Sequence, residues 1–167
     1  MLNINTMKKH FLLAAIACLA IFTSCDKQLV PHTGDVTGNI YGIWTLQTKT
    51  EAIKTSEGVK TNDYDYTNVH FYLALSEFPV PHAIAKKGSF TDFDLDDVDV
   101  DGSIFTFNAD QRKISFKKNL WLTEGLTYSM LLSGTFDVLE LTDKTLIIQQ
   151  EELLGARTVT YSYRRRE

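Results

Sequence analysis

From Ile40 to Arg165 the chain is built of short segments in which apolar and polar residues alternate. A period of two with many β-branched and aromatic residues indicates strands that bury one face. Turn sequences such as Asp101-Gly102 and Leu154-Gly155 separate these segments at short intervals. Roughly eight or nine strands joined in order favour an antiparallel meander, and closing about eight of them leaves no exposed edge. We therefore predict an all-β fold, with an up-and-down barrel as first choice and a two-sheet sandwich as second. The clearest alternations lie at 69–75, 113–117, 128–138 and 158–163.

The first 24 residues have the pattern of a secretory signal peptide. Lys8-Lys9 is followed by the apolar run Phe11–Phe22 and by the small residues Thr23-Ser24. This run is too short for a permanent helix across a hydrocarbon core of ~30 Å. We expect residues 1–24 to be removed, residues 25–39 to form a flexible tether and residues 40–167 to form the folded domain.

The residues around Cys25 resemble the lipobox of bacterial lipoproteins, because a cysteine directly follows Phe22-Thr23-Ser24. The resemblance implies cleavage before Cys25, acylation of this residue, and attachment to the outer membrane of a cell envelope without a transmembrane helix. A periplasmic and a surface position are both compatible with it. The alternative is a plain signal peptide that leaves Cys25 as a free thiol.

Composition supports one folded domain and argues against a nucleic-acid partner. The 167 residues are 44% apolar and 23% charged, enough to build a core. The formal net charge is -4. Loss of Lys8 and Lys9 with the signal leaves 15 basic residues against 21 acidic ones, a net charge of -6. Nucleic-acid binders normally carry a basic excess. Cys18 leaves with the signal, so the mature domain has no disulfide.

Gly42-Ile43-Trp44, at the start of the first expected strand, resembles the G-x-W motif of lipocalins. The meander is similar to lipocalin-like lipoproteins of gut bacteria. In that family the tryptophan plugs one end of the barrel, and an arginine near the end of the last strand lies over its ring. The resemblance implies this role for Trp44 and Arg164, or Arg165 if the strand register differs by one.

No familiar catalytic motif is present, and we predict a protein that is not an enzyme and needs no cofactor. The sequence lacks His-Glu-x-x-His, Gly-x-Ser-x-Gly and a P-loop. Asp97, Asp99, Asp101 and Gly102 reproduce the first half of an EF-hand calcium loop. The twelfth position is Asn108 instead of glutamate. Two interpretations therefore stay open: these aspartates bind calcium, or they form a charged, solvent-facing strand end.

The leading functional hypothesis is a small apolar or amphipathic ligand inside the barrel. Eight-stranded barrels either fill their interior with side chains or hold one such molecule. The alternative is a non-catalytic interaction module with a filled core, which binds a protein or a glycan through exposed Trp121 and Tyr128. A void of ~300 Å³ or more favours a ligand site. The segment Ser76–Ser89 is expected to be a lid or a packed loop. The candidate lining residues are Phe71, Leu73, Phe105, Phe107, Met130 and Tyr161.

Overall fold

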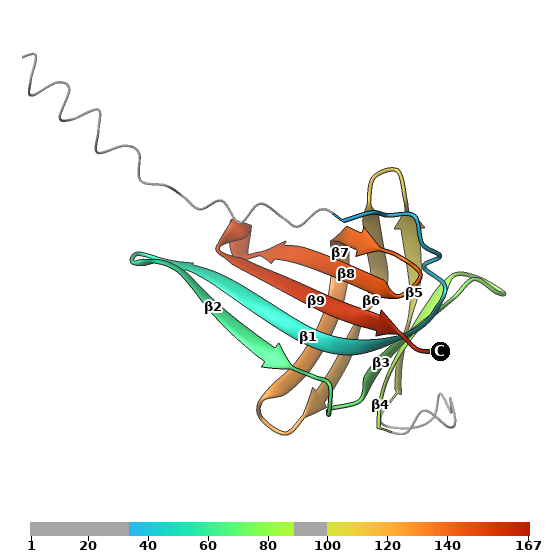
Figure 1. Ribbon diagram of the computed structural model, residues 1–167, viewed down its shortest axis with the longest axis horizontal. Coiled ribbons are helices and arrows are strands. Elements are labelled where there is room, and N and C mark those ends of the chain that lie inside the picture. Colours follow the sequence, from blue (N-terminus) through green and yellow to red (C-terminus); the bar gives the residue numbers. More distant parts are fainter. Residues whose placement is uncertain (1–33, 89–99) are drawn as a thin grey trace, which may run out of the picture. The chain divides into compact units, whose positions relative to one another are not determined.

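The computed structural model describes residues 34–88 and 100–167, which lie in the compact unit His32–Glu167. These residues form nine strands and one short 3₁₀ turn, Leu153–Gly155 (Figure 1). No helix in the described residues is long and apolar enough to cross a membrane. The strands are β1 (Gly42–Thr55), β2 (Gly58–Asp65), β3 (Phe71–Ser76), β4 (His82–Lys87), β5 (Val100–Asn108), β6 (Lys113–Glu124), β7 (Tyr128–Leu141), β8 (Thr145–Glu152) and β9 (Arg157–Arg165).

Eight of the strands in this part of the chain close into an antiparallel up-and-down barrel. The order is β1-β3-β4-β5-β6-β7-β8-β9, and β9 pairs back onto β1. β2 lies outside this ring: it pairs with the second half of β1, while β3 pairs with the first half. The predicted all-β barrel is therefore confirmed, with one extra strand, and its architecture is consistent with a lipocalin-like fold.

The barrel interior is apolar at the end where β1 begins, which we call the Trp44 end. Trp44 and Leu46 of β1, Leu73 of β3 and Phe105 of β5 are almost completely buried. Their neighbours in sequence point outward, as period-two strands require. The opposite end, where β1 ends and β9 begins, we call the Glu51 end.

A bulge in β1 changes which residues face inward. The pairing of β1 with β9 shifts between Leu46 and Thr48. A bulge adds one residue to one strand and so reverses the alternation beyond it. Before the bulge Trp44 and Leu46 are buried; after it Lys49 and Glu51 are buried. The bulge thus turns two charged side chains into the barrel.

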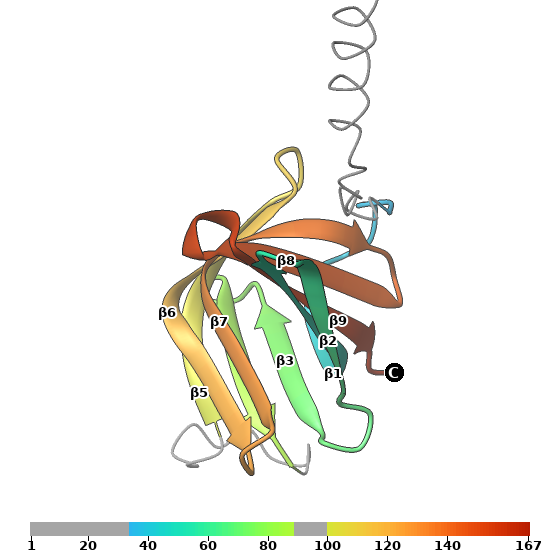
Figure 2. The same cartoon turned by 90° about the vertical axis from the view of Figure 1, so that its left-hand side faces the viewer.

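The first half of β7 lies apart from β8. β7 pairs with β6 between Tyr128 and Asp137, but with β8 only between Asp137 and Leu141 (Figure 2). One backbone edge of β7 is therefore left without a partner strand at the Glu51 end, and side chains bond to it instead, as described below.

The chain before β1 is bound to the barrel from residue 34 onward. Val36 forms a parallel bridge with Leu141. The backbone N–H groups of Thr37 and Gly38 donate to the Leu141 carbonyl, and Leu141 N–H donates to Asp35. Ile40 is 2% exposed. The predicted tether 25–39 thus needs a correction at its end, since residues 34–39 belong to the folded unit; residues 25–33 lie outside the described part.

The segment Ser76–Ser89, predicted as a loop, also contains a strand. Residues His82–Lys87 form β4, which pairs with both β3 and β5. Ala83 and Ala85 alternate with polar and branched residues and are completely buried. The prolines at 79 and 81 favoured a loop over a strand here, although the alternation begins directly after them. In the described part of this segment, residues 77–81 form the connecting loop before β4.

Candidate functional site

Trp44 is covered by Arg165 and not by Arg164. The indole is fully buried and its Nε1–H donates to the Ile40 carbonyl at 2.9 Å. The Arg165 guanidinium carbon lies 4.2 Å from the ring centroid. Trp44 is paired with Arg165 in register, whereas Arg164 is paired with Thr45 and is exposed. The assignment to Arg164 was wrong by one residue, because the side chains of neighbouring strand residues point to opposite faces.

The six predicted lining residues all lie in or against the core. Phe71, Leu73, Phe105, Met130 and Tyr161 are buried, and Phe107 packs against them. They have close side-chain neighbours: Phe71 is 5.5 Å from Tyr66 between ring centroids, and Tyr163 donates its hydroxyl to the Met130 sulfur at 3.3 Å. In these contacts the predicted lining residues pack against other side chains of the core.

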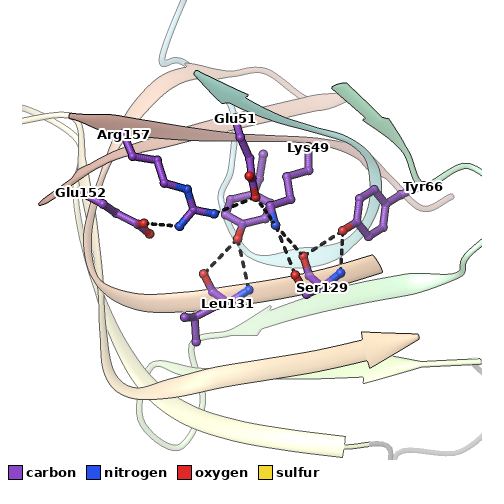
Figure 3. Close-up of polar contacts among 8 residues, drawn as sticks. Lys49, Glu51, Tyr66, Ser129, Leu131, Glu152 and Arg157 are labelled. Carbon is purple, nitrogen blue, oxygen red and sulfur yellow. Dashed lines mark hydrogen bonds and ion pairs between the residues drawn. The ribbon is translucent and has the colours of Figure 1, made fainter. Parts of the chain in front are cut away.

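A chain of four charged residues occupies the interior at the Glu51 end (Figure 3). Glu51 accepts from Lys49 at 2.7 Å and from Arg157 at 2.7 Å. Arg157 also pairs with Glu152 at 2.6 Å. The Lys49 ammonium crosses the interior to the Ser129 carbonyl of β7 at 3.1 Å. The group contains two positive and two negative charges, so the cluster is neutral as a whole.

These ion pairs decide the protonation of Glu51. Burial raises the pKa of its carboxyl. Hydrogen bonds and charges from Lys49 and Arg157 lower the pKa by more than burial raises it, so the net pKa is below the usual value. For Arg157, burial lowers the pKa and Glu51 and Glu152 raise it, with a net rise. Both groups are therefore ionised at neutral pH.

Two tyrosines satisfy the unpaired edge of β7. The Tyr66 hydroxyl donates to the Ser129 carbonyl at 2.8 Å and accepts from the Ser129 N–H at 2.9 Å. Tyr161 does the same with Leu131, at 3.1 Å for each bond. Burial raises the pKa of Tyr66 to about 12 and that of Tyr161 well above its usual value. Both phenols therefore stay protonated and can donate.

Of the three predicted calcium ligands only Asp101 lies in the described part; Asp97 and Asp99 lie outside it. One Asp101 carboxylate oxygen accepts the Gly102 N–H at 2.9 Å and the other accepts the Trp121 N–H at 3.0 Å. Asp101 thus links β5 to β6. Among residues 34–88 and 100–167 no three acidic, histidine or cysteine side chains gather around a possible metal position.

An open groove of about 660 Å³ lies against the outer face of β4 and β5. Ile84 and Ile104 point outward there, since Ala83 and Phe105 beside them point into the core. Gly102, opposite Ile84 in register, leaves the floor without a side chain. The described residues that line the groove are Pro79, Val80, His82, Ala83, Ile84, Gly102, Ser103, Ile104, Lys117 and Lys118.

Two neighbouring lysines of β6 form one wall of this groove. Lys117 and Lys118 lie where the β6–β7 register is interrupted, between Phe116 and Leu120. Consecutive residues of a regular strand point to opposite faces, but the interruption lets both line the same hollow. The Lys118 N–H donates to the Ser103 hydroxyl at 2.8 Å, which fixes the backbone there.

None of the six predicted lining residues lines this groove. The functional residues that sequence reasoning missed are of two kinds. Lys49 and Glu51 come inside through the bulge in β1, which period-two reasoning does not see. Arg157 continues the inward face of Val159 and Tyr161 at the start of β9. The sequence feature that could have indicated the groove was the apolar pair Val80 and Ile84 in a proline-rich segment, together with Ile104 on the outer face of the next strand. Comparison with known proteins adds no assignment, because no family model, curated protein or solved structure matches this chain.

Proposed function

We propose that this protein is a lipid-anchored lipoprotein of the cell envelope that binds a small apolar or amphipathic molecule. The anchor is proposed from the sequence: a signal-like segment ends in small residues directly before Cys25. Acyl chains on Cys25 would attach the protein to the outer membrane. The barrel would then hold its ligand close to a source of apolar molecules.

The groove on β4 and β5 carries the ligand proposal. Its volume of about 660 Å³ lies in the range of ~300–1,000 Å³ that small-molecule sites occupy. Its lining is mostly apolar, and the polar residues in it are His82 of β4, Ser103 of β5, and Lys117 and Lys118 of β6. This places the proposed site on the outer wall of the barrel, whereas the sequence had suggested the interior.

Blocking the groove tests this proposal. Gly102 has no left-handed φ, and a Cβ there would meet only the Ala83 carbonyl at 3.9 Å. Gly102→Leu therefore fills the hollow without straining the backbone. We expect the neutral fluorophore N-phenyl-1-naphthylamine to bind the chain from residue 26 onward, which contains the whole compact unit. Binding should weaken at least tenfold in Gly102→Leu and less in Gly102→Ala.

The matched control is Leu154→Ala. Leu154 is a fully exposed apolar residue in the turn before β9, outside the groove lining. Its loss should leave fluorophore binding unchanged. Equal binding by the wild type and Gly102→Leu would remove the groove from the proposal.

The anchor has a separate test. Metabolic labelling with a radioactive fatty acid should mark the wild-type chain and not Cys25→Ala, which should remain as an unprocessed precursor. Label on the Cys25→Ala chain would contradict lipidation at this residue.

An interaction module is the second candidate function. Trp121 is 65% exposed and lies opposite Leu131, 42% exposed, in the β6–β7 register. Exposed aromatic residues are frequent anchors of interfaces. Tyr128, the other predicted anchor, instead packs edge-on against Tyr66 at 5.1 Å. This candidate would be favoured if none of the groove ligands binds and if a protein or glycan partner binds the wild type but not Trp121→Ala.

A further inference from the structure

The charges around the groove specify its ligand further, on the assumption that the proposed function holds. The described residues that line it include two lysines and one histidine but no aspartate or glutamate. This is unusual for a chain whose net charge is -4. The positive charge is also on one side only, since Lys117 and Lys118 both come from β6.

Neither lysine is neutralised within the described part of the chain. Lys49, Lys87 and Lys113 each pair with a carboxylate. Across residues 34–88 and 100–167, Lys117 and Lys118 form no such ion pair, and both side chains are exposed. An ammonium that has no internal partner is available to a ligand anion.

The histidine of the lining is turned to its own loop. The His82 Nδ1 lies 2.9 Å from the Val80 carbonyl oxygen and shares a hydrogen bond with it. This bond occupies one ring nitrogen of His82, and the two lysines provide two ammonium groups. Val80, Ile84 and Ile104 provide the apolar surface on the remaining sides.

We propose that the groove binds a monomeric amphiphile with an anionic head group. Lys117 and Lys118 contact the anion, and the apolar body lies along Val80, Ile84 and Ile104. Apolar burial supplies most of the attraction and does not depend on direction, whereas the two ammonium groups fix the orientation. A neutral or cationic amphiphile of the same length binds more weakly, because it leaves the lysines without a counter-charge or repels them.

Three ten-carbon probes test the head group. Decanoate, decanol and decyltrimethylammonium are titrated, below the concentrations at which they aggregate, against N-phenyl-1-naphthylamine bound to the chain from residue 26 onward. We expect decanoate to displace the fluorophore at the lowest concentration and the cation at the highest. Exposed ion pairs are worth ~0.2–1 kcal/mol each, so two lysines should favour decanoate over decanol roughly two- to thirtyfold. This preference should decrease as salt rises.

The lysine variants locate the preference. Lys117→Glu/Lys118→Glu should abolish or reverse the preference for decanoate over decanol, and Lys117→Gln/Lys118→Gln should abolish it without adding negative charge. Lys60→Glu/Lys144→Glu is the matched control, since both lysines are exposed and outside the groove lining. It makes the same change in net charge and should leave the preference intact.

The outcomes separate this inference from the proposed function. Equal binding of decanoate and decanol, unchanged in both groove-lysine variants, would overturn the anionic head group and leave the apolar site standing. A preference lost equally in Lys60→Glu/Lys144→Glu would also overturn it, because net charge would then be the cause. If no probe and no fluorophore binds, the proposed function fails as well. Binding to vesicles of anionic phospholipid without binding of monomers would replace the pocket with a membrane-surface contact.

Discussion

Arg165 joins the start and the end of the folded unit. Its guanidinium lies over Trp44 and donates to the carbonyls of Tyr41 and Asn39, before β1. It also donates to Asp143 in the turn before β8, at 2.7 Å. One planar group thus satisfies three backbone acceptors and covers an aromatic face, which a lysine could not do.

Arg165→Ala should therefore destabilise the protein, and Arg164→Ala should not. A cation over a desolvated indole contributes about 2 kcal/mol, and the freed carbonyls add to the loss. Urea unfolding of both variants measures this. A double-mutant cycle with Trp44→Leu should give a coupling energy of about 2 kcal/mol for Arg165 and near zero for Arg164. Equal losses at the two arginines would contradict the assignment.

Glu51 is the centre of the internal charge cluster, because both cations contact it. Its lowered pKa means that the folded state holds the ionised carboxyl more strongly than the unfolded chain does. The resulting stabilisation is complete above the unfolded pKa near 4.5 and is lost as pH falls from there through the lower pKa of the folded state.

Glu51→Gln should cost roughly 3 kcal/mol at pH 7, since it leaves the buried Lys49 without a carboxylate and the half-buried Arg157 with Glu152 alone. Below about pH 4.5, protonation of Glu51 destabilises the wild type. Gln cannot be protonated in this way, so the stability of the variant should fall less steeply with pH there than that of the wild type. Unfolding curves between pH 3 and pH 7 would show both effects. Glu151→Gln, at the exposed neighbour of Glu152, should change stability by less than about 0.5 kcal/mol. A parallel pH profile for wild type and Glu51→Gln would refute the role.

At the scale of elements, the first half of β7 receives hydrogen bonds from side chains on the edge where a neighbouring strand would normally pair. Tyr66, Tyr161 and Gln150 bond to backbone groups of β7 between Ser129 and Thr135. An unpaired edge is otherwise open to pairing with another chain. The tyrosines thus complete the barrel at the Glu51 end, where the first half of β7 has no ladder with β8.

Tyr161→Phe should loosen this edge. The substitution removes the hydroxyl that bonds to both the N–H and the carbonyl of Leu131. The N–H is then left without a partner, at a cost of about 1–3 kcal/mol. Hydrogen exchange of the Leu131 amide should become faster while amides bonded between β6 and β7 stay protected. Tyr163→Phe is the control, because the Tyr163 hydroxyl contacts the Met130 sulfur and no β7 backbone group in the described contacts. Unchanged exchange at Leu131 in Tyr161→Phe would show that the edge does not rely on the phenol.

Strands were predictable from the sequence where alternation is unbroken. The patterns at 113–117 and 158–163 are those of β6 and β9, and each buries the expected side. Prediction failed where extra residues disturb the pairing of two strands. One extra residue reverses the alternation in β1 after Leu46, and two extra residues interrupt it in β6 between Phe116 and Leu120. Both irregularities place charged residues in unforeseen positions, Lys49 and Glu51 inside and Lys117 and Lys118 at the groove. The candidate site was therefore the least predictable part, since bulges have no distinct residue pattern in either strand.

At the scale of the whole folded unit, the segment before β1 acts as part of the barrel wall. Its backbone pairs with Leu141, and the side chain of Arg112 on the β5–β6 turn donates to the Gly34 carbonyl. Ile40 closes the core at the Trp44 end and accepts the indole N–H. The proposed lipid anchor at Cys25 would thus be connected to a fixed edge of the barrel by the residues that precede Gly34.

Gly38→Ala tests whether this docking stabilises the fold. A Cβ at Gly38 would overlap the backbone of Thr142, which cannot move without disturbing the β7–β8 turn. At Gly34 a Cβ would meet the Glu140 side chain from Cγ to Oε2, which can rotate away. We therefore expect Gly38→Ala to lower the free energy of unfolding by about 1–3 kcal/mol and Gly34→Ala to change it little. Urea unfolding compares the two variants, and hydrogen exchange at Leu141 should rise only in Gly38→Ala. Equal stability of both variants would mean that the segment lies on the barrel without supporting it.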